Sequence, residues 1–271
     1  MCEKILKIPE YITAENTSAY LSTEFIGKRL IVLDLVTSTN DYIKTLQHSD
    51  FINGTVVVAR EQSAGKGRLG RQWITKRDDC LAFSILLKPQ LSPCEVSSIT
   101  PLAGLAVCKA IRKFTGLDCK LKWPNDIIIG KKKLCGILTE MSADFNCVKY
   151  IVLGIGINIS QADFPCEISE KATSIMLETG KNPDKNRFFA TVLNCIEEQL
   201  MQSNYKLSQN MIEEYSAMCA TIGRNVTFFR GTEQVSGLAV AINKDAELIV
   251  KTSDGSTNIV NSGEVTVQGI Y

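Results

Sequence analysis

Histidine and paired cysteines are what this 271-residue sequence most clearly lacks. It has a single histidine, His48, and no two of its 10 cysteines form a Cys-x-x-Cys pair. Structural zinc sites need clustered cysteine and histidine ligands, and Ser-His or Cys-His catalysis needs a histidine beside the nucleophile. These absences argue against a zinc module, a disulfide framework and histidine-assisted nucleophilic catalysis. We expect cysteines inside apolar runs, such as Cys108, to be free buried thiols.

A net charge and long apolar runs are also missing. The 30 Lys and Arg residues nearly balance the 29 Asp and Glu residues, so the whole chain has no electrostatic attraction for nucleic acid or an anionic membrane. No run reaches the ~18 apolar residues of a membrane-spanning helix. The charged N-terminal residues 1–15 contain no apolar core of a secretion signal. We therefore expect a protein of a reducing, cytoplasmic compartment, with neither nucleic acid nor membrane as a partner.

The apolar pattern that is present predicts an α+β protein. Expected strands cover residues 28–36, 55–60, 80–88, 120–123, 126–129, 134–141 and 148–159, and expected helices cover 38–47, 95–114, 184–202 and 209–218. From Gly223 the sequence changes to short strands separated by tight turns, which predicts a small β module, expected to be a barrel. The chain is thus divided into a main domain, residues 1–222, and a C-terminal module, residues 223–271.

The segment with the most chemical information is QSAGKGRLGRQW, residues 62–73, in which glycines alternate with cations directly after an expected strand. Glycines let backbone N–H groups approach an anion closely, and Lys and Arg add charge and N–H donors. This composition predicts a loop that folds over a phosphate, and the alternative is a basic surface loop. It is neither a Walker A loop nor a dinucleotide-binding fingerprint.

Two further segments carry side chains suited to phosphate chemistry. In KWPND, residues 122–126, Pro124 interrupts a strand pattern and exposes Asn125 and Asp126, whose oxygens suit Mg²⁺ alongside phosphates. The alternative is an ordinary Pro-Asn-Asp turn. In KKKLCGILTE, residues 131–140, Lys133 is the last lysine before an apolar strand and can point inward, whereas a triple lysine is most often a solvated turn. Gly136 would leave room for a flat ligand.

Glycines also interrupt the strand expected at residues 148–159. Gly154 and Gly156 in the run GIGIN weaken a buried strand, and such glycines often mark a ligand or another backbone packed closely. Earlier in the chain Ser38, Thr39 and Asn40 supply side chains for a helix N-cap, which fully explains them on local grounds.

Together and in this order, these segments resemble the catalytic domain of biotin–protein ligases. The resemblance covers about residues 30–160 and continues more loosely through the C-terminal module. It depends on the STN cap, the glycine/arginine loop, KWPND, KLCGILTE and GIGIN. Two positions depart from the family pattern, because Lys66 stands where arginine is usual and Leu69 where a second arginine is common. Lys66 keeps the charge but loses the two-pronged geometry of arginine.

The resemblance implies a fold and a reaction. The fold is a central mixed β-sheet flanked by helices, followed by a C-terminal SH3-like barrel. In the reaction, the carboxylate of biotin attacks the α-phosphate of ATP, with Mg²⁺, to give biotinyl-5′-AMP and pyrophosphate. A lysine of a biotin carboxyl carrier protein, or of such a domain in a biotin-dependent carboxylase, then attacks the adenylate and releases AMP. Members of the family are monomers or homodimers.

The resemblance also implies a role for individual residues. Ser38, Thr39 and Gln62 would bind the ureido ring of biotin, and Asn40 would shape that end of the site. Lys133, Arg68 and Asp126 would be the catalytic residues, with Lys133 holding first the carboxylate and then the phosphate, and Asp126 binding Mg²⁺ and helping to deprotonate the acceptor lysine. The other implied binding residues are Gly65, Lys66, Gly67 and Arg71 over the adenylate, Lys122 and Asn125 at the phosphates, and Gly136, Gly154, Ile155, Ile157 and Asn158 along the apolar slot and its strand.

Three other functions are compatible with parts of this evidence. A lipoate–protein ligase shares the fold and the chemistry, but a lipoate site has no ureido group to bind, so the glycine/arginine loop and KWPND favour biotin. A binding protein that holds biotin or a nucleotide without turnover would not need the three cations of the loop and Asp126. A transcriptional regulator would need an N-terminal DNA-binding domain, and only about 28 residues precede the first expected strand.

Overall fold

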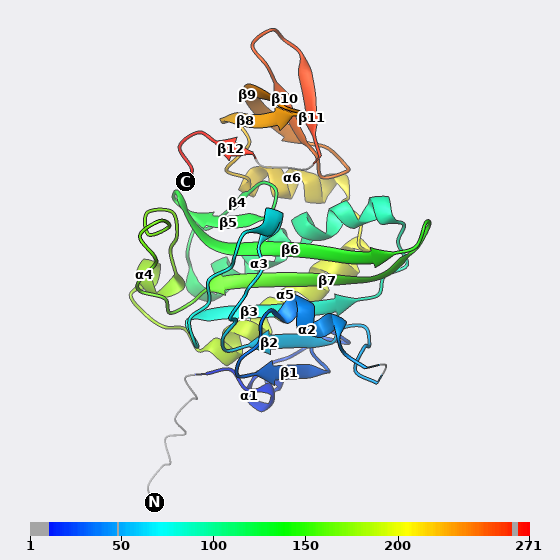
Figure 1. Ribbon diagram of the computed structural model, residues 1–271, viewed down its shortest axis with the longest axis vertical. Coiled ribbons are helices and arrows are strands. Elements are labelled where there is room, and N and C mark those ends of the chain that lie inside the picture. Colours follow the sequence, from blue (N-terminus) through cyan, green and yellow to red (C-terminus); the bar gives the residue numbers. More distant parts are fainter. Residues whose placement is uncertain (1–10, 48, 262–264) are drawn as a thin grey trace, which may run out of the picture.

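Two β-sheets organise the protein (Figure 1). The computed structural model describes residues 11–47, 49–261 and 265–271, so Cys2 and His48 lie outside the described residues. A seven-stranded sheet has the order β1-β2-β3-β7-β6-β5-β4, and a five-stranded sheet has the order β11-β10-β9-β8-β12. In the larger sheet β1 and β2 are parallel and the other neighbours are antiparallel. The expected mixed sheet is therefore confirmed.

The elements of the main domain agree with the sequence pattern except for the shortest ones. The helices α1 and α4 were not expected, because five residues are too few to show a helical period. The strands are β1 (Leu30–Leu33), β2 (Val56–Ala59), β3 (Cys80–Leu87), β4 (Lys120–Lys122), β5 (Asp126–Ile129), β6 (Lys132–Ala143) and β7 (Val148–Asn158). The helices are α1 (Ala14–Ser18), α2 (Thr39–Lys44), α3 (Ile99–Thr115), α4 (Ile175–Thr179), α5 (Lys185–Ser203) and α6 (Gln209–Met218), with 3-10 turns at Arg68–Gly70 and Pro93–Ser98.

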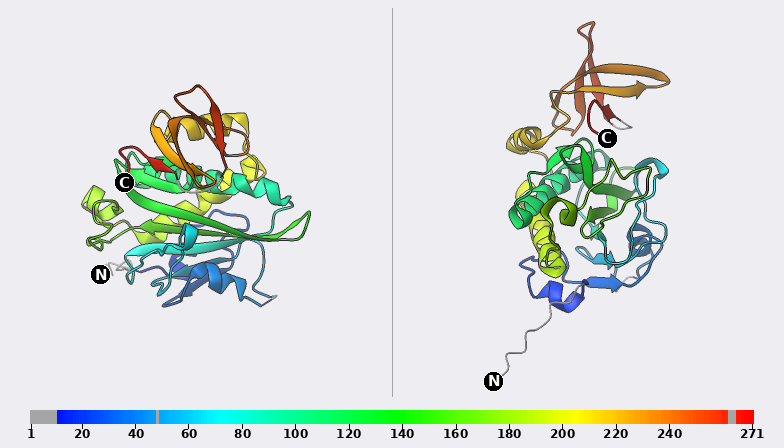
Figure 2. Two further views of the ribbon diagram at one scale, coloured as in Figure 1. Left: turned by 45° about the horizontal axis from the view of Figure 1, so that its top comes forward. Right: turned by 90° about the vertical axis from the view of Figure 1, so that its left-hand side faces the viewer.

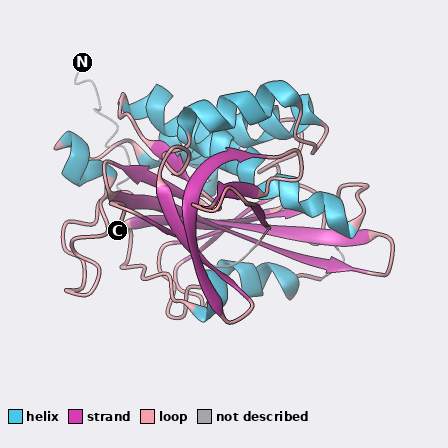
Figure 3. Cartoon of the chain, turned by 90° about the horizontal axis from the view of Figure 1, so that it is seen from above, coloured by secondary structure: helices cyan, strands magenta, loops and turns pink. Residues whose placement is uncertain are grey.

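Helices cover both faces of the larger sheet (Figure 3). Val56 and Val58 of β2 belong to the main core cluster, which contains the buried faces of α3 and α5. Val57, between them, belongs to a second cluster with Ile43 of α2. Side chains alternate between the two faces of a strand, so α2 lies on the face opposite to α3 and α5. The α2 face carries the candidate site.

Helix α3 is the most apolar helix of the core. The segment Pro93–Thr115 is long and apolar enough to cross a membrane by length and composition, but 72% of its most apolar stretch is buried inside the fold. The helix packs against α5 and ends at Gly116, which has a left-handed φ of 76°. Its apolar composition is accounted for by this position in the core.

The C-terminal module is an antiparallel sheet that stands on the main domain (Figure 2). Its strands are β8 (Asn225–Arg230), β9 (Glu233–Ile242), β10 (Leu248–Lys251), β11 (Thr257–Val260) and β12 (Thr266–Val267). Within the described residues the end strands β11 and β12 do not pair, so the sheet is open and the expected closed barrel is not formed. The two-residue strand β12 pairs with β8.

The module shares its core with the main domain. Val226 and Phe228 belong to the same hydrophobic cluster as α3 and the larger sheet. Trp123 of the main domain donates its indole N–H to the carbonyl oxygen of Ala246 at 2.9 Å, and its backbone N–H donates to Thr221 Oγ1 at 3.0 Å. The C-terminal module is thereby fixed beside KWPND.

Candidate active site

The floor of the site is a row of small residues across three strands. Gly156 of β7 pairs with Ala82 of β3 on one side and with Gly136 of β6 on the other. No side chain larger than a methyl group rises from this row. The α2 face of the sheet is therefore flat where three strands meet, which is the arrangement that the glycines at 136 and 154–156 suggested.

The indole of Trp73 lies on this floor. A Cβ atom added to Gly136 would come within 3.1 Å of Trp73 Cζ3, and one added to Gly156 would overlap the same ring. Trp73 donates its indole N–H to the sulfur of Cys80 at 3.2 Å. Sequence reasoning placed a flat ligand beside Gly136 and gave Trp73 no role, whereas here the flat group is the protein's own side chain.

The pocket around this floor collects most of the residues that the sequence singled out. Its free volume is about 50 Å³, room for only a few water molecules, because the indole fills the rest. A larger, open cleft beside it lies beneath the glycine/arginine loop and is lined by Gly65 and Arg71 together with Leu138 and Glu140. The predicted residues that line the pocket are Ser38, Thr39, Asn40, Gln62, Lys66, Gly67, Arg68, Asn125, Lys133, Gly136, Gly154 and Ile155.

One end of the pocket is a buried polar cluster. The backbone N–H and the hydroxyl of Thr39 donate to Gln62 Oε1 at 2.8 and 3.1 Å. Ser84, which carried no sequence signal, has its hydroxyl oxygen 2.5 Å from Asn40 Oδ1 and 2.8 Å from Thr39 Oγ1, within hydrogen-bond distance of both. Ser38 stands at the N-cap of α2 but makes no side-chain cap hydrogen bond. Helix capping alone therefore does not account for these polar side chains.

The parallel pairing of β1 and β2 brings this cluster together. Beyond the two strands the pairing continues as a bridge between Val36 and Gln62. The backbone N–H groups of Ser63 and Ala64 donate to the carbonyl oxygens of Val36 and Thr37, each at 2.9 Å. The start of the loop therefore runs beside the start of α2, which places Gln62 against Thr39.

The loop itself is an irregular hairpin rather than an open coil. Trp73 N–H donates to Gly65 O at 2.8 Å and Gly67 N–H donates to Arg71 O at 2.7 Å, with a 3-10 turn at the tip. A Cβ atom on Gly65 would overlap the carbonyl oxygen of Trp73, so only glycine fits there. Arg68 Nη1 donates to Asn125 Oδ1 at 3.1 Å and so joins the tip to KWPND.

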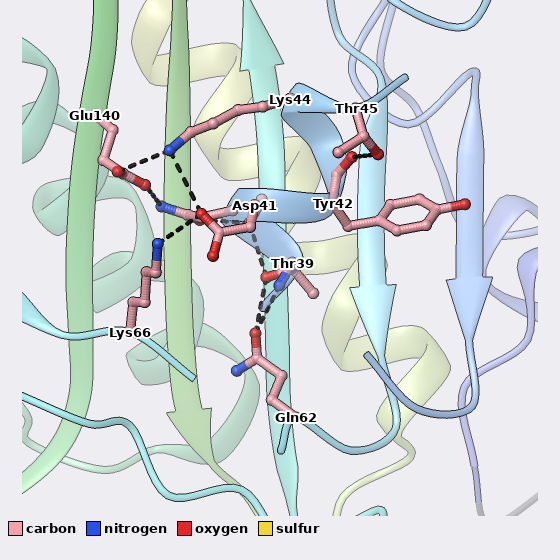
Figure 4. Close-up of polar contacts among 10 residues, drawn as sticks. Thr39, Asp41, Tyr42, Lys44, Thr45, Gln62, Lys66 and Glu140 are labelled. Carbon is pink, nitrogen blue, oxygen red and sulfur yellow. Dashed lines mark hydrogen bonds and ion pairs between the residues drawn. The ribbon is translucent and has the colours of Figure 1, made fainter. Parts of the chain in front are cut away.

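Charged side chains fasten the loop to α2, and α2 in turn to β6 (Figure 4). Lys66 Nζ lies 2.7 Å from Asp41 Oδ1, and this hydrogen bond raises the pKa of Lys66 above its ordinary value. Glu140 accepts from Lys44 Nζ at 2.8 Å and from Asn40 Nδ2 at 2.7 Å. We call the Lys66–Asp41 pair the loop latch. The latch adjoins the polar cluster through Asn40.

We expect the loop latch to slow, by a small factor, the escape of a ligand bound under the loop. Both side chains are more than a third exposed, and exposed ion pairs contribute ~0.2–1 kcal/mol, roughly a 1.4- to 5-fold change in rate. Lys66→Ala and Asp41→Ala should each speed release of a ligand bound under the loop by such a factor. The double variant should release the ligand no faster than either single variant. Added salt should reduce the difference in release rate between the wild type and the variants, because it screens the ion pair. Additive effects of the two changes, measured by rapid filtration, would contradict the latch.

Lys133 reaches the pocket because β6 is bulged beside it. The register between β5 and β6 shifts where Ile128 faces Lys133 and Ile127 faces Cys135. Such a bulge re-aims a side chain, and both Leu134 and Cys135 enter the core. Lys133 Nζ then lies 2.6 Å from Asp126 Oδ1, while its backbone N–H donates to Lys171 O at 2.7 Å. The inward direction expected for Lys133 is what the structure has, whereas Lys131 and Lys132 are exposed.

Residues of KWPND line the pocket, as Asn125 does, or contact a residue that lines it, as Asp126 does. Asn125 exchanges two hydrogen bonds with the backbone of Ile137, at 2.7 and 2.9 Å, which fixes its amide oxygen toward Arg68. Asp126 does not line the pocket but touches it through Lys133. Its second oxygen accepts a hydrogen bond from the hydroxyl of Tyr271. Lys122 Nζ lies 4.0 Å from the centre of the Tyr271 ring.

Of the GIGIN residues predicted to bind the ligand, Ile155 reaches the pocket, whereas Ile157 and Asn158 do not. Ile155 and Ile157 belong to the main core cluster, because side chains alternate along β7 and the glycines face the pocket. Ile155 still contributes to the pocket wall, whereas Ile157 does not. Asn158 is buried and donates to the carbonyl oxygen of Thr173 at 2.9 Å, which ties the end of β7 to the segment that also holds Lys133.

The chemistry available here is charge and positioning. Burial raises the pKa of the Cys80 thiol to about 12, so this cysteine stays protonated and is a poor nucleophile. Among the described residues no three His, Cys, Asp or Glu side chains cluster to hold a metal ion. What remains is an ammonium, a guanidinium and a carboxylate beside a narrow pocket with a polar end. This arrangement suits the activation of a carboxylate by charge stabilisation.

Comparison with known proteins defines the class first. Residues 32–158 match the Biotin/lipoate A/B protein ligase family, and residues 221–267 match the Biotin protein ligase C terminal domain. The bifunctional ligase/repressor BirA of Bacillus subtilis is 31% identical over 268 residues, which cover 96% of this chain and 80% of that protein. The chain belongs to the biotin/lipoate ligase family.

The relatives also define the branch. The biotin–[acetyl-CoA-carboxylase] ligase of Mycobacterium tuberculosis is 31% identical over 244 residues, 88% of each chain. The solved structure of the biotin protein ligase from Aquifex aeolicus in complex with biotin and ATP has a TM-score of 0.77 and 31% identity, and it covers 89% of this chain and 99% of that one. Within the family, the chain is one of the biotin–protein ligases.

Proposed function

We propose that the protein attaches biotin to a lysine of a biotin carboxyl carrier protein or domain, through biotinyl-5′-AMP formed from biotin and ATP. The observation that carries this proposal is the order of groups along one pocket. Asn40 of the buried polar cluster lies against Gly154, the glycine floor continues to Gly156 and Gly136, and Lys133 lies against Gly136. Arg68 lines the same pocket. Biotin presents a ureido ring, a thiophane ring and a carboxylate in the same order.

The polar cluster would bind the ureido ring. That ring has one carbonyl acceptor and two N–H donors, and burying them without partners costs several kcal/mol. Thr39, Asn40 and Gln62 offer hydroxyl and amide groups of both kinds, and Ser38 is buried beside them. The thiophane ring and tail would lie over Gly136 and Gly154. Because the indole of Trp73 occupies that floor, it has to move when biotin enters.

Lys133 and Arg68 would promote the adenylation step. The ammonium of Lys133 would neutralise the biotin carboxylate as it approaches the α-phosphate, and would then stay with the phosphate of the adenylate. Arg68, at the loop tip, would cover that phosphate, with Lys66, Gly67 and Arg71 completing the closed loop. Preorganised charges in a site closed to water stabilise a developing charge more strongly than water does.

Magnesium would arrive with ATP rather than occupy a protein site. Among the described residues, Asp126 is the carboxylate that contacts Lys133, and its other oxygen already contacts Tyr271. Mg²⁺ typically keeps several waters and binds through one or two carboxylates and the substrate phosphates. We therefore treat Mg·ATP as the substrate, with Asp126 as the protein ligand that would meet the ion, Asn125 beside it and Lys122 nearby.

In the transfer step the acceptor lysine would attack the acyl carbon of biotinyl-AMP, and AMP would leave. Asp126 would help to take up the proton of that amine. We also propose a cytoplasmic, reducing compartment, where buried thiols such as Cys108 and Cys119 stay reduced. The near-neutral charge of the chain supports a carrier protein rather than nucleic acid as its macromolecular partner.

Pyrophosphate exchange tests the acid that the enzyme activates. With labelled pyrophosphate and ATP, biotin should support formation of labelled ATP, whereas lipoate at the same concentration should not. Lipoate lacks the ureido group, so the polar cluster would be left without partners. Exchange that depends on lipoate and not on biotin would replace this proposal by lipoate ligation.

Removal of the C-terminal module should weaken the use of ATP. We place the domain boundary between residues 222 and 223, and we expect a chain ending at 222 to fold with a KM for ATP raised about tenfold or more. The truncation removes the contacts of Ala246 and Tyr271 with KWPND, and a hydrogen bond to a charged group contributes ~1.5–3 kcal/mol. Circular dichroism checks the fold. A folded truncated chain with the KM of the full chain would assign the module another purpose.

A further inference from the structure

The C-terminal module delivers one side chain, Tyr271, to Asp126, the carboxylate that contacts Lys133. Strand β12 pairs with β8, and after Gly269, which has a φ of 77°, the chain turns back so that Ile270 N–H donates to Val267 O at 3.1 Å. Ile270 is buried in the shared core. This anchoring places Tyr271 next to KWPND, 145 residues away in sequence from Asp126.

Tyr271 contacts the second carboxylate oxygen of Asp126. The carboxylate has one oxygen 2.6 Å from Lys133 Nζ, and its other oxygen accepts the hydroxyl hydrogen of Tyr271. The Asp126 side chain is only 13% exposed, so few water molecules can replace this donor. Burial, and then the neighbouring Asp126 charge, raise the pKa of Tyr271, so the phenol stays protonated and remains a donor.

The ring of Tyr271 has a second contact. Lys122, which is paired with Asp126 across β4 and β5, has its ammonium 4.0 Å from the ring centre. Lys122 is 8% exposed, and a cation over an aromatic face is stabilised most when it is removed from water. One side chain therefore holds a carboxylate with its hydroxyl and covers a cation with its ring.

We propose that Tyr271 is a positioning residue of the active site, which fixes Asp126 so that its other oxygen faces Lys133. The proposal rests on the function proposed above. Without the hydroxyl, the Asp126 carboxylate can rotate, and Lys133 loses the contact that keeps its ammonium at the phosphate end of the pocket. The C-terminal module thus takes part in adenylation by orienting Lys133 through Asp126, and biotin itself does not touch Tyr271.

The test compares Tyr271→Phe, which keeps the ring, with Tyr271→Leu, which removes ring and hydroxyl. Tyr20→Phe is the matched control, because Tyr20 is exposed and does not line the pocket. In biotin-dependent pyrophosphate exchange, Tyr271→Phe should lower kcat roughly tenfold or more, the range for a lost hydrogen bond to a charged group, with the KM for biotin unchanged within about twofold. The melting temperature of Tyr271→Phe should stay near that of the wild type. Tyr20→Phe should behave as the wild type.

A double variant separates positioning from packing. If Tyr271 acts through Asp126 on Lys133, adding Tyr271→Phe to Lys133→Ala should lower the single-turnover rate of adenylate formation by less than twofold, because the two changes remove the same effect. If the rate losses of Tyr271→Phe and Lys133→Ala multiply in the double variant, the proposal is wrong. It is also wrong if Tyr271→Phe keeps the wild-type kcat and only the destabilised Tyr271→Leu loses activity. Absence of biotin-dependent exchange in the wild type would instead overturn the proposed function.

Discussion

Lys133→Ala should lower the rate of biotin-dependent pyrophosphate exchange by roughly 30- to 1,000-fold, a loss of ~2–4 kcal/mol of transition-state stabilisation. The bulge in β6 and the pairing with residues 171–173 hold the backbone of Lys133, so its ammonium is available at the pocket without reorganisation. In the proposed mechanism, removing it would leave the carboxylate of biotin without a counter-charge, and it removes the partner of Asp126 at 2.6 Å. The rate and the KM for biotin are measured together.

The neighbouring lysines are the controls for this prediction. Lys131 and Lys132 precede Lys133 directly, are exposed, and do not line the pocket. Lys131→Ala and Lys132→Ala remove the same charge from the same turn, so their exchange rates should stay within about twofold of the wild type. Equal activity in all three variants would show that Lys133 does not act on the carboxylate.

Arg68→Gly should let the adenylate escape from the site. The guanidinium at the loop tip is held by Asn125 at 3.1 Å, where it can cover the phosphate of biotinyl-AMP. Losing a charge-assisted hydrogen bond costs ~1.5–3 kcal/mol, which corresponds to roughly 10- to 100-fold faster release. Free biotinyl-AMP then acylates exposed lysines of any protein present. Biotin on bovine serum albumin, detected with labelled streptavidin, measures the leak, and Lys131→Ala serves as the control.

The same loop can be followed by limited trypsin digestion. Ordering a backbone residue costs about 1–2 kcal/mol, and the loop of residues 62–75 contains several glycines and long cationic side chains. We expect trypsin to cut after Lys66, Arg68 or Arg71 in the free enzyme. Biotin with ATP should protect these bonds, ATP alone should protect them poorly, and Arg68→Gly should lower the protection. A loop equally resistant with and without ligands is rigid, and the closing mechanism then fails.

The sequence predicted the main sheet and its long helices because their apolar periods extend over enough residues to be recognised. It also predicted that Lys133 points inward, from its place before an apolar strand. The cause, a bulge opposite Ile127 and Ile128, depends on a pairing between strands that no local pattern reveals. Helices α1 and α4 were missed because five residues are too few to show a helical period. The expected barrel is not closed, because within the described residues the end strands β11 and β12 do not pair.

The contacts between distant segments were the least predictable part of the site. Glycines at 136 and 156 indicated a flat neighbour, but only the register of β3, β7 and β6 shows that the indole of Trp73 lies there. Nothing in the sequence distinguishes Ser84 from other small residues of a buried strand, and its role is evident only from its contact with Asn40. Tyr271 carries no local sign of its contact with Asp126. These side chains meet through tertiary packing, whereas a sequence pattern reports neighbours along the chain.

The proposed function requires that this chain forms biotinyl-AMP and passes the biotin to a carrier lysine. The most direct measurement uses ATP labelled at its α-phosphate, with biotin, in the presence and absence of a purified biotin carboxyl carrier domain. Without the carrier, the label should stay with the enzyme as biotinyl-AMP. With the carrier, it should appear as free AMP, while the carrier gains one biotin by mass spectrometry. Labelled biotinyl-AMP that persists unchanged in the presence of the carrier, or no labelled adenylate at all, would contradict this account.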